Sequence, residues 1–279
     1  MQTPERIVAE IENALASTND RTFFFYDDNF TANPKRMHEL CDLLIEKKLN
    51  ISWSAQVRSD IARDPELVQK MAKAGCYFVF IGFESIDDEA LKAMHKSQTR
   101  SDIEKAIRVI HTYGIGIHGM FMFGDDHCTT ENITNTVNFA MQHDIDTVQF
   151  MILTPFPGTQ IYDQIVSEKR LFHRDWDYYN AMFIVFQPKL MSAANLQSET
   201  TLAYGRFYSL WKAVTDAVWL IINVFLDALV WNFRNANRYN LKSMVIRAAA
   251  GSIVSKYSHS YDTYAKYLKD IERKQILSK

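Results

Sequence analysis

The chain has 279 residues, of which 47% are apolar and 23% charged, and its formal net charge is −2. Such a chain can bury the core of one large domain, and its charge balance argues against a nucleic-acid partner, which requires a basic excess. The N-terminus lacks the cationic, apolar and small-residue succession of a secretory signal, and three cysteines without paired spacing indicate a reducing compartment. We therefore expect a cytoplasmic protein.

Helix and strand patterns alternate from the N-terminus to about residue 170. Short apolar runs bounded by polar residues predict strands over 22–26, 51–56, 77–81, 116–122 and 146–153. Apolar residues at helical spacing, several behind a capping residue and a proline, predict helices over 4–15, 34–45, 65–74, 87–95, 100–113, 130–143 and 160–167. The third apolar run, YFVFIGFES at 77–85, is expected to break at Gly82 into a polar loop that ends in Glu84.

The alternation itself predicts the fold class. Strands that alternate with helices are joined by crossover connections, which make the sheet parallel. Because these strands are apolar nearly throughout, we expect the sheet to be covered on both faces, as in a barrel or a doubly wound sheet. We favour an α/β fold with a TIM-type (β/α) barrel over residues 1–190, followed by an α-helical C-terminal extension over residues 191–279.

Polar residues gather directly after the predicted strands. In parallel α/β folds the reacting groups lie on the loops after the carboxyl ends of the strands. Carboxylates from separate strands together with one arginine can bind a zwitterionic ligand, although any single Asp or Asn at such a place can equally be a helix cap. The prediction therefore rests on the set, which in chain order is Asp27-Asp28-Asn29, Gln56-Val57-Arg58, Gly82-Phe83-Glu84-Ser85, Phe121 to Asp126 and Leu153-Thr154-Pro155.

A family resemblance makes this set specific. The segments FFFYDDNF, WSAQVR, AGCYFVFIGFES, GIGIHGMFMFG and LTPFPGT, in this order and spacing, resemble the radical S-adenosylmethionine (SAM) barrel, in particular the branch that carries an upstream cobalamin-binding domain. The resemblance covers residues 1 to about 190. It implies a SAM site whose cofactor-binding residues are Asp27, Asp28, Asn29, Gln56, Arg58, Gly82, Glu84, Ser85, Gly119, Phe121, Gly124, Leu153, Thr154 and Pro155.

The same resemblance implies a role for each segment. Residues 27–29 would lie beside the methionine end of SAM. Arg58 and Glu84 would lie toward its carboxylate, ribose or ammonium. Residues 119–124 and 153–155 would flank the adenine, largely through backbone groups.

The chain departs from the family at the metal centre. The family holds a 4Fe-4S cluster by three cysteines in a CxxxCxxC loop, and this chain has only Cys41, Cys76 and Cys128, separated by 35 and 52 residues. We interpret these as ordinary buried cysteines and predict no metal ligand. The opening segment ERIVAEIE resembles the stretch directly after the cysteine loop in the family, so we expect the first barrel strand, the cluster loop and any cobalamin domain to be supplied before Met1 or by a partner chain.

This departure has a consequence for activity. In the family, the cluster delivers the electron that cleaves SAM into methionine and a 5′-deoxyadenosyl radical. Without a cluster, the chain alone is expected to be inactive and to contribute most of the SAM pocket to a longer protein or a complex.

The C-terminal extension leaves two interpretations open. Residues 195–232 predict a long helix, in which Asp216 and Asp227 interrupt the apolar run well below the ~20 residues of a membrane span. The helix either packs on the barrel or leads to a contact with an anionic membrane, since residues 234–279 carry ten Lys and Arg against three Asp and Glu. The residues of that predicted contact are Trp231, Phe233, Arg234, Arg238 and Lys242.

Two aromatic groups complete the C-terminal half. One group consists of His173, Trp176, Tyr178 and Tyr179. These residues could line a substrate pocket, but we favour the interpretation that they form the edge of the core. Tyrosines 257, 261, 264 and 267 predict a terminal helix that docks its tyrosine side.

Three functions are consistent with these patterns. The favoured one is the SAM-binding portion of a radical SAM enzyme, dependent on a 4Fe-4S cluster and on cobalamin in full length, which performs methyl transfer or other radical chemistry on a small, hydrophobic, lipid-like substrate. The second is a non-catalytic barrel that binds a ligand or partner. The third is an unrelated parallel barrel in which Asp28, Arg58 and Glu84 perform acid-base chemistry. The ordered set of motifs favours the first.

Overall fold

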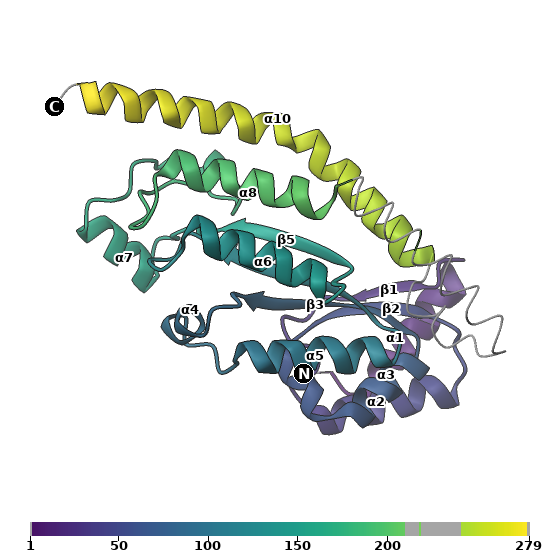
Figure 1. Ribbon diagram of the computed structural model, residues 1–279. Helices are drawn as coiled ribbons and strands as arrows, with labels where there is room; N and C mark the ends of the chain where they lie inside the picture. Colours follow the sequence, from purple (N-terminus) through teal and green to yellow (C-terminus); the bar gives the residue numbers. More distant parts are fainter. Residues whose placement is uncertain (1, 210–217, 219–240, 278–279) are drawn as a thin grey trace.

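The structure, a computed structural model, describes residues 2–209, 218 and 241–277. Its centre is a parallel five-stranded sheet in which neighbouring strands follow one another in chain order (Figure 1). The strands are β1 (Thr22–Phe25), β2 (Ser52–Val57), β3 (Cys76–Glu84), β4 (Gly116–Phe123) and β5 (Thr147–Ile152). Because β1 and β5 do not pair with each other, the sheet is an open, partial barrel, and the predicted α/β class is confirmed.

The helices begin where the sequence predicts. Thr3, Asn33 and Asp64 each accept a hydrogen bond from a backbone N–H of the following helix, and each precedes a proline whose missing N–H costs nothing in the first turn. The chain opens on α1 (Pro4–Ser17), and the elements between the strands are α2 (Pro34–Glu46), the 3-10 helix η1 (Ser59–Arg63), α3 (Pro65–Lys73), α4 (Asp88–Ala93), α5 (Arg100–Thr112) and α6 (Thr130–Gln142). In Figure 1, α5 and α6 lie in front of the sheet.

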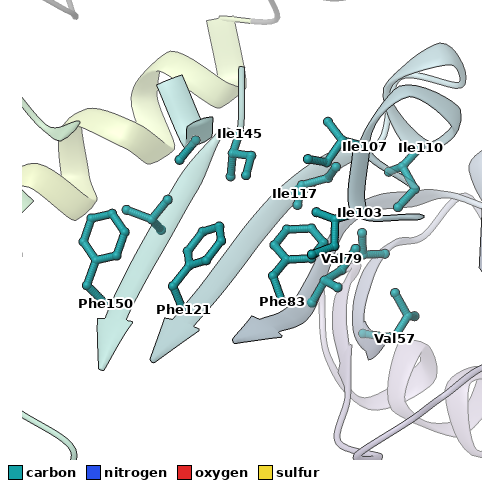
Figure 2. Packing of buried hydrophobic residues seen from close by; sticks show 14 of the residues in the cluster. Val57, Val79, Phe83, Ile103, Ile107, Ile110, Ile117, Phe121, Ile145 and Phe150 are labelled. Atoms are coloured by element: carbon teal, nitrogen blue, oxygen red, sulfur yellow. The ribbon is translucent and has the colours of Figure 1, made fainter. Parts of the chain in front are cut away.

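One face of the sheet carries the main apolar core. Phe83, Phe121 and Phe150 project from β3, β4 and β5 toward the helices, where Ile103 and Ile107 of α5 also lie (Figure 2). All five side chains are at most 2% exposed. Successive residues of a strand point to opposite faces, so Phe80, His118 and Met120 face the other side, which we call the inner face.

The structure corrects the predicted end of the third strand. β3 does not break at Gly82: Gly82 pairs with Met120 and Glu84 pairs with Phe121, while the register shifts between them so that Phe83 is an extra residue. This is a β-bulge, and the buried ring of Phe83 keeps the chain on the sheet through it. Glu84 is therefore held by the end of a strand and not by a free loop.

The C-terminal helices pack on the β5 side of the molecule. After α7 (Gln160–Ser167) and the 3-10 helix η2 (Trp176–Tyr178) come α8 (Ala193–Phe207) and α10 (Leu241–Leu277). Figure 1 shows α10 running along α8. The predicted helix over 195–232 is wrong in length, because α8 ends at Phe207. Residues 210–217 and 219–240 lie outside the described residues, and so do Trp231, Phe233, Arg234 and Arg238 of the predicted membrane contact.

Tyrosines attach α10 to the core. The Tyr264 hydroxyl donates to the carbonyl of Ile184 at 2.8 Å, and its ring stacks on Tyr178 with centroids 5.0 Å apart. These contacts confirm the predicted docking at Tyr264 and the interpretation of Tyr178 as core edge, whereas Tyr267, predicted on the same side, is 52% exposed. Across the described residues, no helix combines the length and apolar content that a membrane crossing requires.

Two tyrosine hydroxyls cover the free edge of β5. The Tyr204 hydroxyl accepts from the N–H of Phe150 at 2.9 Å and donates to its carbonyl at 3.0 Å. The Tyr208 hydroxyl makes the same pair of bonds to Val148, both at 2.9 Å. These hydroxyls occupy the hydrogen-bonding positions that a sixth strand would fill, so α8 protects an edge that would otherwise be exposed.

The substitution Tyr204→Phe tests this arrangement. It removes only the hydroxyl and leaves the buried N–H and carbonyl of Phe150 unpaired, so we expect a loss of about 1 to 3 kcal/mol in the free energy of unfolding, measured by urea titration. Tyr267→Phe on the exposed side of α10 is the matched control and should change stability by less than about 0.5 kcal/mol. Equal stabilities of the two variants would contradict the role given to Tyr204.

Candidate functional site

An open pocket of about 510 Å³ lies at the carboxyl ends of β2 and β3. We call it the strand-end pocket. It contains six of the residues that the sequence predicts to bind a cofactor: Asp28, Asn29, Gln56, Arg58, Gly82 and Glu84. The other lining residues are Val57, Ser59, Phe80, Met94, His95, Lys96, Gln98 and Met120. Three separate connections of the chain thus converge as the parallel topology requires.

The rim of the pocket carries balanced charge. Asp28 and Arg58 are exposed, whereas Glu84 is 18% exposed and pairs with Lys96, the Oε1 to Nζ distance being 2.9 Å. Within the described part of the chain, no carboxylate lies at ion-pair distance from Arg58. Two carboxylates and two cations around one opening suit a ligand that carries both an ammonium and a carboxylate group.

The backbone around Glu84 is unusual. Its φ is +64°, in the left-handed region that side chains other than glycine rarely adopt. A side chain at Gly82, two residues earlier, would displace the carboxylate, because a Cβ there would lie 2.7 Å from Oε1 of Glu84. The strained residue and the glycine together direct the Glu84 carboxylate into the pocket, and such strain persists only where the surrounding structure enforces it.

The connection between α4 and α5 supplies four pocket residues that sequence reasoning missed. Met94, His95, Lys96 and Gln98 follow a helix, so the rule that searches strand ends does not reach them. His95 adopts a left-handed φ of +54° and ends α4, and the N–H of Lys96 then donates to the carbonyl of Leu91 at 2.9 Å. This turn brings Lys96 back over the end of β3.

Three predicted residues from the first half of the chain lie elsewhere. Asp27 faces a separate groove of about 410 Å³ between α1 and β1. Ser85 lines a small cavity on the other side of Glu84, where its hydroxyl accepts from the N–H of Asp87 at 3.0 Å. Phe121 is buried on the helix side of the sheet, so it can serve the pocket only through its backbone.

The predicted residues within β4 and after β4 and β5 also lie outside the strand-end pocket. Gly119 faces the helix side, where a Cβ would lie 3.1 to 3.3 Å from neighbouring core side chains. Gly124 has a φ of +99°, and a Cβ there would lie 2.7 Å from Leu196. Leu153, Thr154 and Pro155 follow β5, and the N–H of Leu153 donates to the carbonyl of Phe123 at 2.8 Å. Their predicted contact with adenine stays a prediction.

Apolar and aromatic side chains form the floor of the pocket on the inner face. The ring of Phe80 lies 5.5 Å from that of Phe24 and 5.0 Å from that of His118, measured between centroids. Nδ1 of His118 lies 2.7 Å from the Thr147 hydroxyl. Burial lowers the pKa of His118 to about 4, so the imidazole is neutral at pH 7 and acts only through hydrogen bonds.

The described residues do not fit an iron-sulfur cluster. Cys41 lies on α2, Cys76 on β3 and Cys128 before α6, and all three are buried. Burial raises the pKa of the Cys41 and Cys128 thiols to about 12, whereas a metal ligand must be a thiolate. In the described ranges, no three His, Cys, Asp or Glu residues come together as a metal site.

Residues 1–155, more than half of the chain, match the family described as the radical SAM superfamily. The chain belongs to this superfamily. Members of the family use SAM and a 4Fe-4S cluster. The bacteriochlorophyllide d C-12(1)-methyltransferase of Chlorobaculum tepidum is 34% identical over 175 residues, which are 62% of this chain and 38% of that protein.

Solved structures of two radical SAM enzymes share the fold. TsrM, a methyltransferase from Kitasatospora setae solved with its tryptophan substrate and a SAM analogue, has a TM-score of 0.60 and 18% identity over 73% of this chain and 46% of its own. OxsB, solved with aqua-cobalamin and SAM, has a TM-score of 0.60 and 12% identity over 99% of this chain and 51% of its own. The chain thus spans about half or less of the relatives it matches.

The buried histidine predicts a dependence of stability on pH. Because the folded chain lowers the pKa of His118 from 6.5 to about 4, the unfolded chain binds a proton that the folded chain does not between these values, and stability falls as the pH drops through this window. His118→Gln removes this contribution. The unfolding free energy of the parent minus that of the variant should therefore fall by about 3 kcal/mol from pH 7 to pH 4, measured by urea titration. A difference that does not change with pH would contradict the assignment.

Proposed function

We propose that this chain is the SAM-binding portion of a radical SAM enzyme that transfers a methyl group, or performs related radical chemistry, on a small hydrophobic molecule. The observation that carries the proposal is the convergence of Asp28, Arg58, Glu84 and Lys96 on one pocket at the strand ends. The membership of the superfamily and the methyltransferase among its relatives support it.

The charges of the rim match the methionine moiety of SAM. That moiety carries an ammonium and a carboxylate on one carbon. The carboxylates of Asp28 and Glu84 can accept hydrogen bonds from the ammonium or from the ribose hydroxyls, and the guanidinium of Arg58 can bind the carboxylate through two parallel bonds. Lys96, which the sequence did not single out, adds a second cation to the same opening.

The remaining cofactors belong to the full-length enzyme in this proposal. A bound 4Fe-4S cluster supplies the electron for cleavage of the SAM sulfonium, and its ligands would come from the region supplied in cis or by a partner chain. Cobalamin is proposed for the same enzyme, with support from the cobalamin-dependent OxsB fold. The described residues of this chain would bind SAM, orient it and shield its methionine end.

The substrate is proposed to lie against the inner face of the sheet. Phe24, Phe80 and Met120 offer an apolar and aromatic surface next to the charged rim. Relatives act on small molecules with flat ring systems, namely a bacteriochlorophyllide and tryptophan. A hydrophobic ring compound or lipid-like molecule suits this surface.

Three further statements stay proposals. They are the division into a barrel at 1–190 and an extension at 191–279, the cytoplasmic location, and the peripheral contact with an anionic membrane.

Substitution of Glu84 tests the SAM site. Glu84→Gln keeps the size of the side chain and removes its charge, so it should weaken SAM binding by about tenfold or more, because hydrogen bonds to charged groups contribute about 1.5 to 3 kcal/mol. Isothermal titration calorimetry with SAM measures the dissociation constant. Glu46→Gln, an exposed change at the end of α2, is the control and should bind SAM as the parent chain does.

Two outcomes would contradict the proposed site. If the parent chain and Glu84→Gln bind SAM equally well, Glu84 is not part of the site. If neither binds SAM at all while both remain folded by circular dichroism, the strand-end pocket is not a SAM site in this chain.

Cluster reconstitution tests whether the ligands of the 4Fe-4S cluster lie outside this chain. Anaerobic incubation of this chain with iron and sulfide should yield no 4Fe-4S cluster, since its thiols are buried on three separate elements. Visible absorption and electron paramagnetic resonance after reduction provide the measurement. A stoichiometric cluster signal, lost in Cys41→Ser, would contradict the assignment of the ligands to another region.

A further inference from the structure

Gln98 joins two of the connections that form the strand-end pocket. Its Nε2 donates to the carbonyl of Phe83 at 2.9 Å, and its Oε1 accepts from the hydroxyl of Ser59. A backbone carbonyl can only accept, so the bond to Phe83 fixes which end of the amide faces which partner. Ser59 directly follows Arg58, and Phe83 directly precedes Glu84.

We infer that Gln98 is a positioning residue for ligand binding, which acts by fixing the Glu84 carboxylate relative to Arg58. This inference rests on the proposed function. It assigns to Gln98 no contact with the ligand of its own: the amide acts through the two residues whose neighbours it binds.

The strained backbone of Glu84 explains why the hydrogen bonds of Gln98 are needed. The β-bulge removes the regular pairing that would otherwise set the direction of the side chain, and the left-handed φ of +64° is unfavourable for glutamate. The side chain of Phe83 is anchored in the core on the helix face. Its carbonyl accepts two hydrogen bonds, one from the N–H of Ser85 at 2.8 Å and one from Nε2 of Gln98, and together they hold the peptide unit that connects directly to Glu84.

The amide is itself held by rigid neighbours. Gln98 precedes Thr99, the N-cap of α5, whose hydroxyl and backbone form a capping box with Asp102. Ser59 is only 6% exposed and begins η1, which packs against α5. Gln98 therefore links the start of a capped helix to the ends of β2 and β3. A shift of either strand end would break one of its two hydrogen bonds.

The test uses a substitution of similar length. Gln98→Met keeps the side-chain volume and removes both hydrogen bonds. It should raise the dissociation constant for SAM about five- to tenfold in isothermal titration calorimetry, while the chain remains folded by circular dichroism. Gln142→Met, an exposed change at the end of α6, is the matched control and should leave the constant unchanged.

A double-mutant cycle separates positioning from general structural damage. If Gln98 acts through the Glu84 carboxylate, the same change made in the Glu84→Gln chain should raise the dissociation constant less than twofold. Full additivity of the two effects would overturn the inference, and so would equal SAM binding by the parent and Gln98→Met. Failure of the parent chain to bind SAM would overturn the proposed function as well, so the two failures are distinguishable.

Discussion

The parallel pairing of five strands in chain order is the constraint on which the site depends. Two neighbouring strands can be parallel only if the chain crosses back to the amino-terminal end of the sheet between them. The carboxyl ends of all five strands therefore lie at the same end of the sheet. The helix-side core fixes the strands against one another through Phe83, Phe121 and Phe150. As a result, side chains that are far apart in the sequence, such as Arg58 and Glu84, line one pocket without any direct bond between them.

The pocket combines regular support with local strain. β2 ends in an ordinary extended conformation before Arg58, whose φ is −101°, whereas β3 ends in a bulge with a left-handed glutamate. A departure of this kind costs on the order of 1 to 3 kcal/mol. The buried ring of Phe83 and the two bonds that its carbonyl accepts, from the N–H of Ser85 and from Gln98, offset this cost. The packing of the core therefore holds the Glu84 carboxylate in a direction that a regular strand would not give it.

The fold and half of the site can be predicted from simple sequence patterns, and the rest fails for physical reasons. Apolar runs in the sequence predict the strands. A capping residue before a proline, such as Asn33 or Asp64, predicts the start of a helix. Asp28 and Glu84 are found by the strand-end rule. Lys96 and Gln98 are not, because they reach the pocket from a connection between helices, through a turn in which His95, and not the glycine that would mark it in the sequence, adopts the left-handed conformation. Strand β4 shows a second limit: apart from His118 its side chains are apolar on both faces, so alternation in the pattern GIHGMFMF groups the residues that share a face but does not tell which group faces the helices.

The ion pair between Glu84 and Lys96 bears on how the pocket selects a ligand. A ligand ammonium that reaches Glu84 displaces Lys96, so a cation that has no carboxylate leaves the ammonium of Lys96 unpaired. A simple cation therefore gains little from the pocket. A zwitterion does better, because its carboxylate can bind Arg58 and the released Lys96 while its ammonium takes the place of Lys96 on Glu84. The balanced charge of the rim thus favours a ligand that carries both groups at a fixed separation.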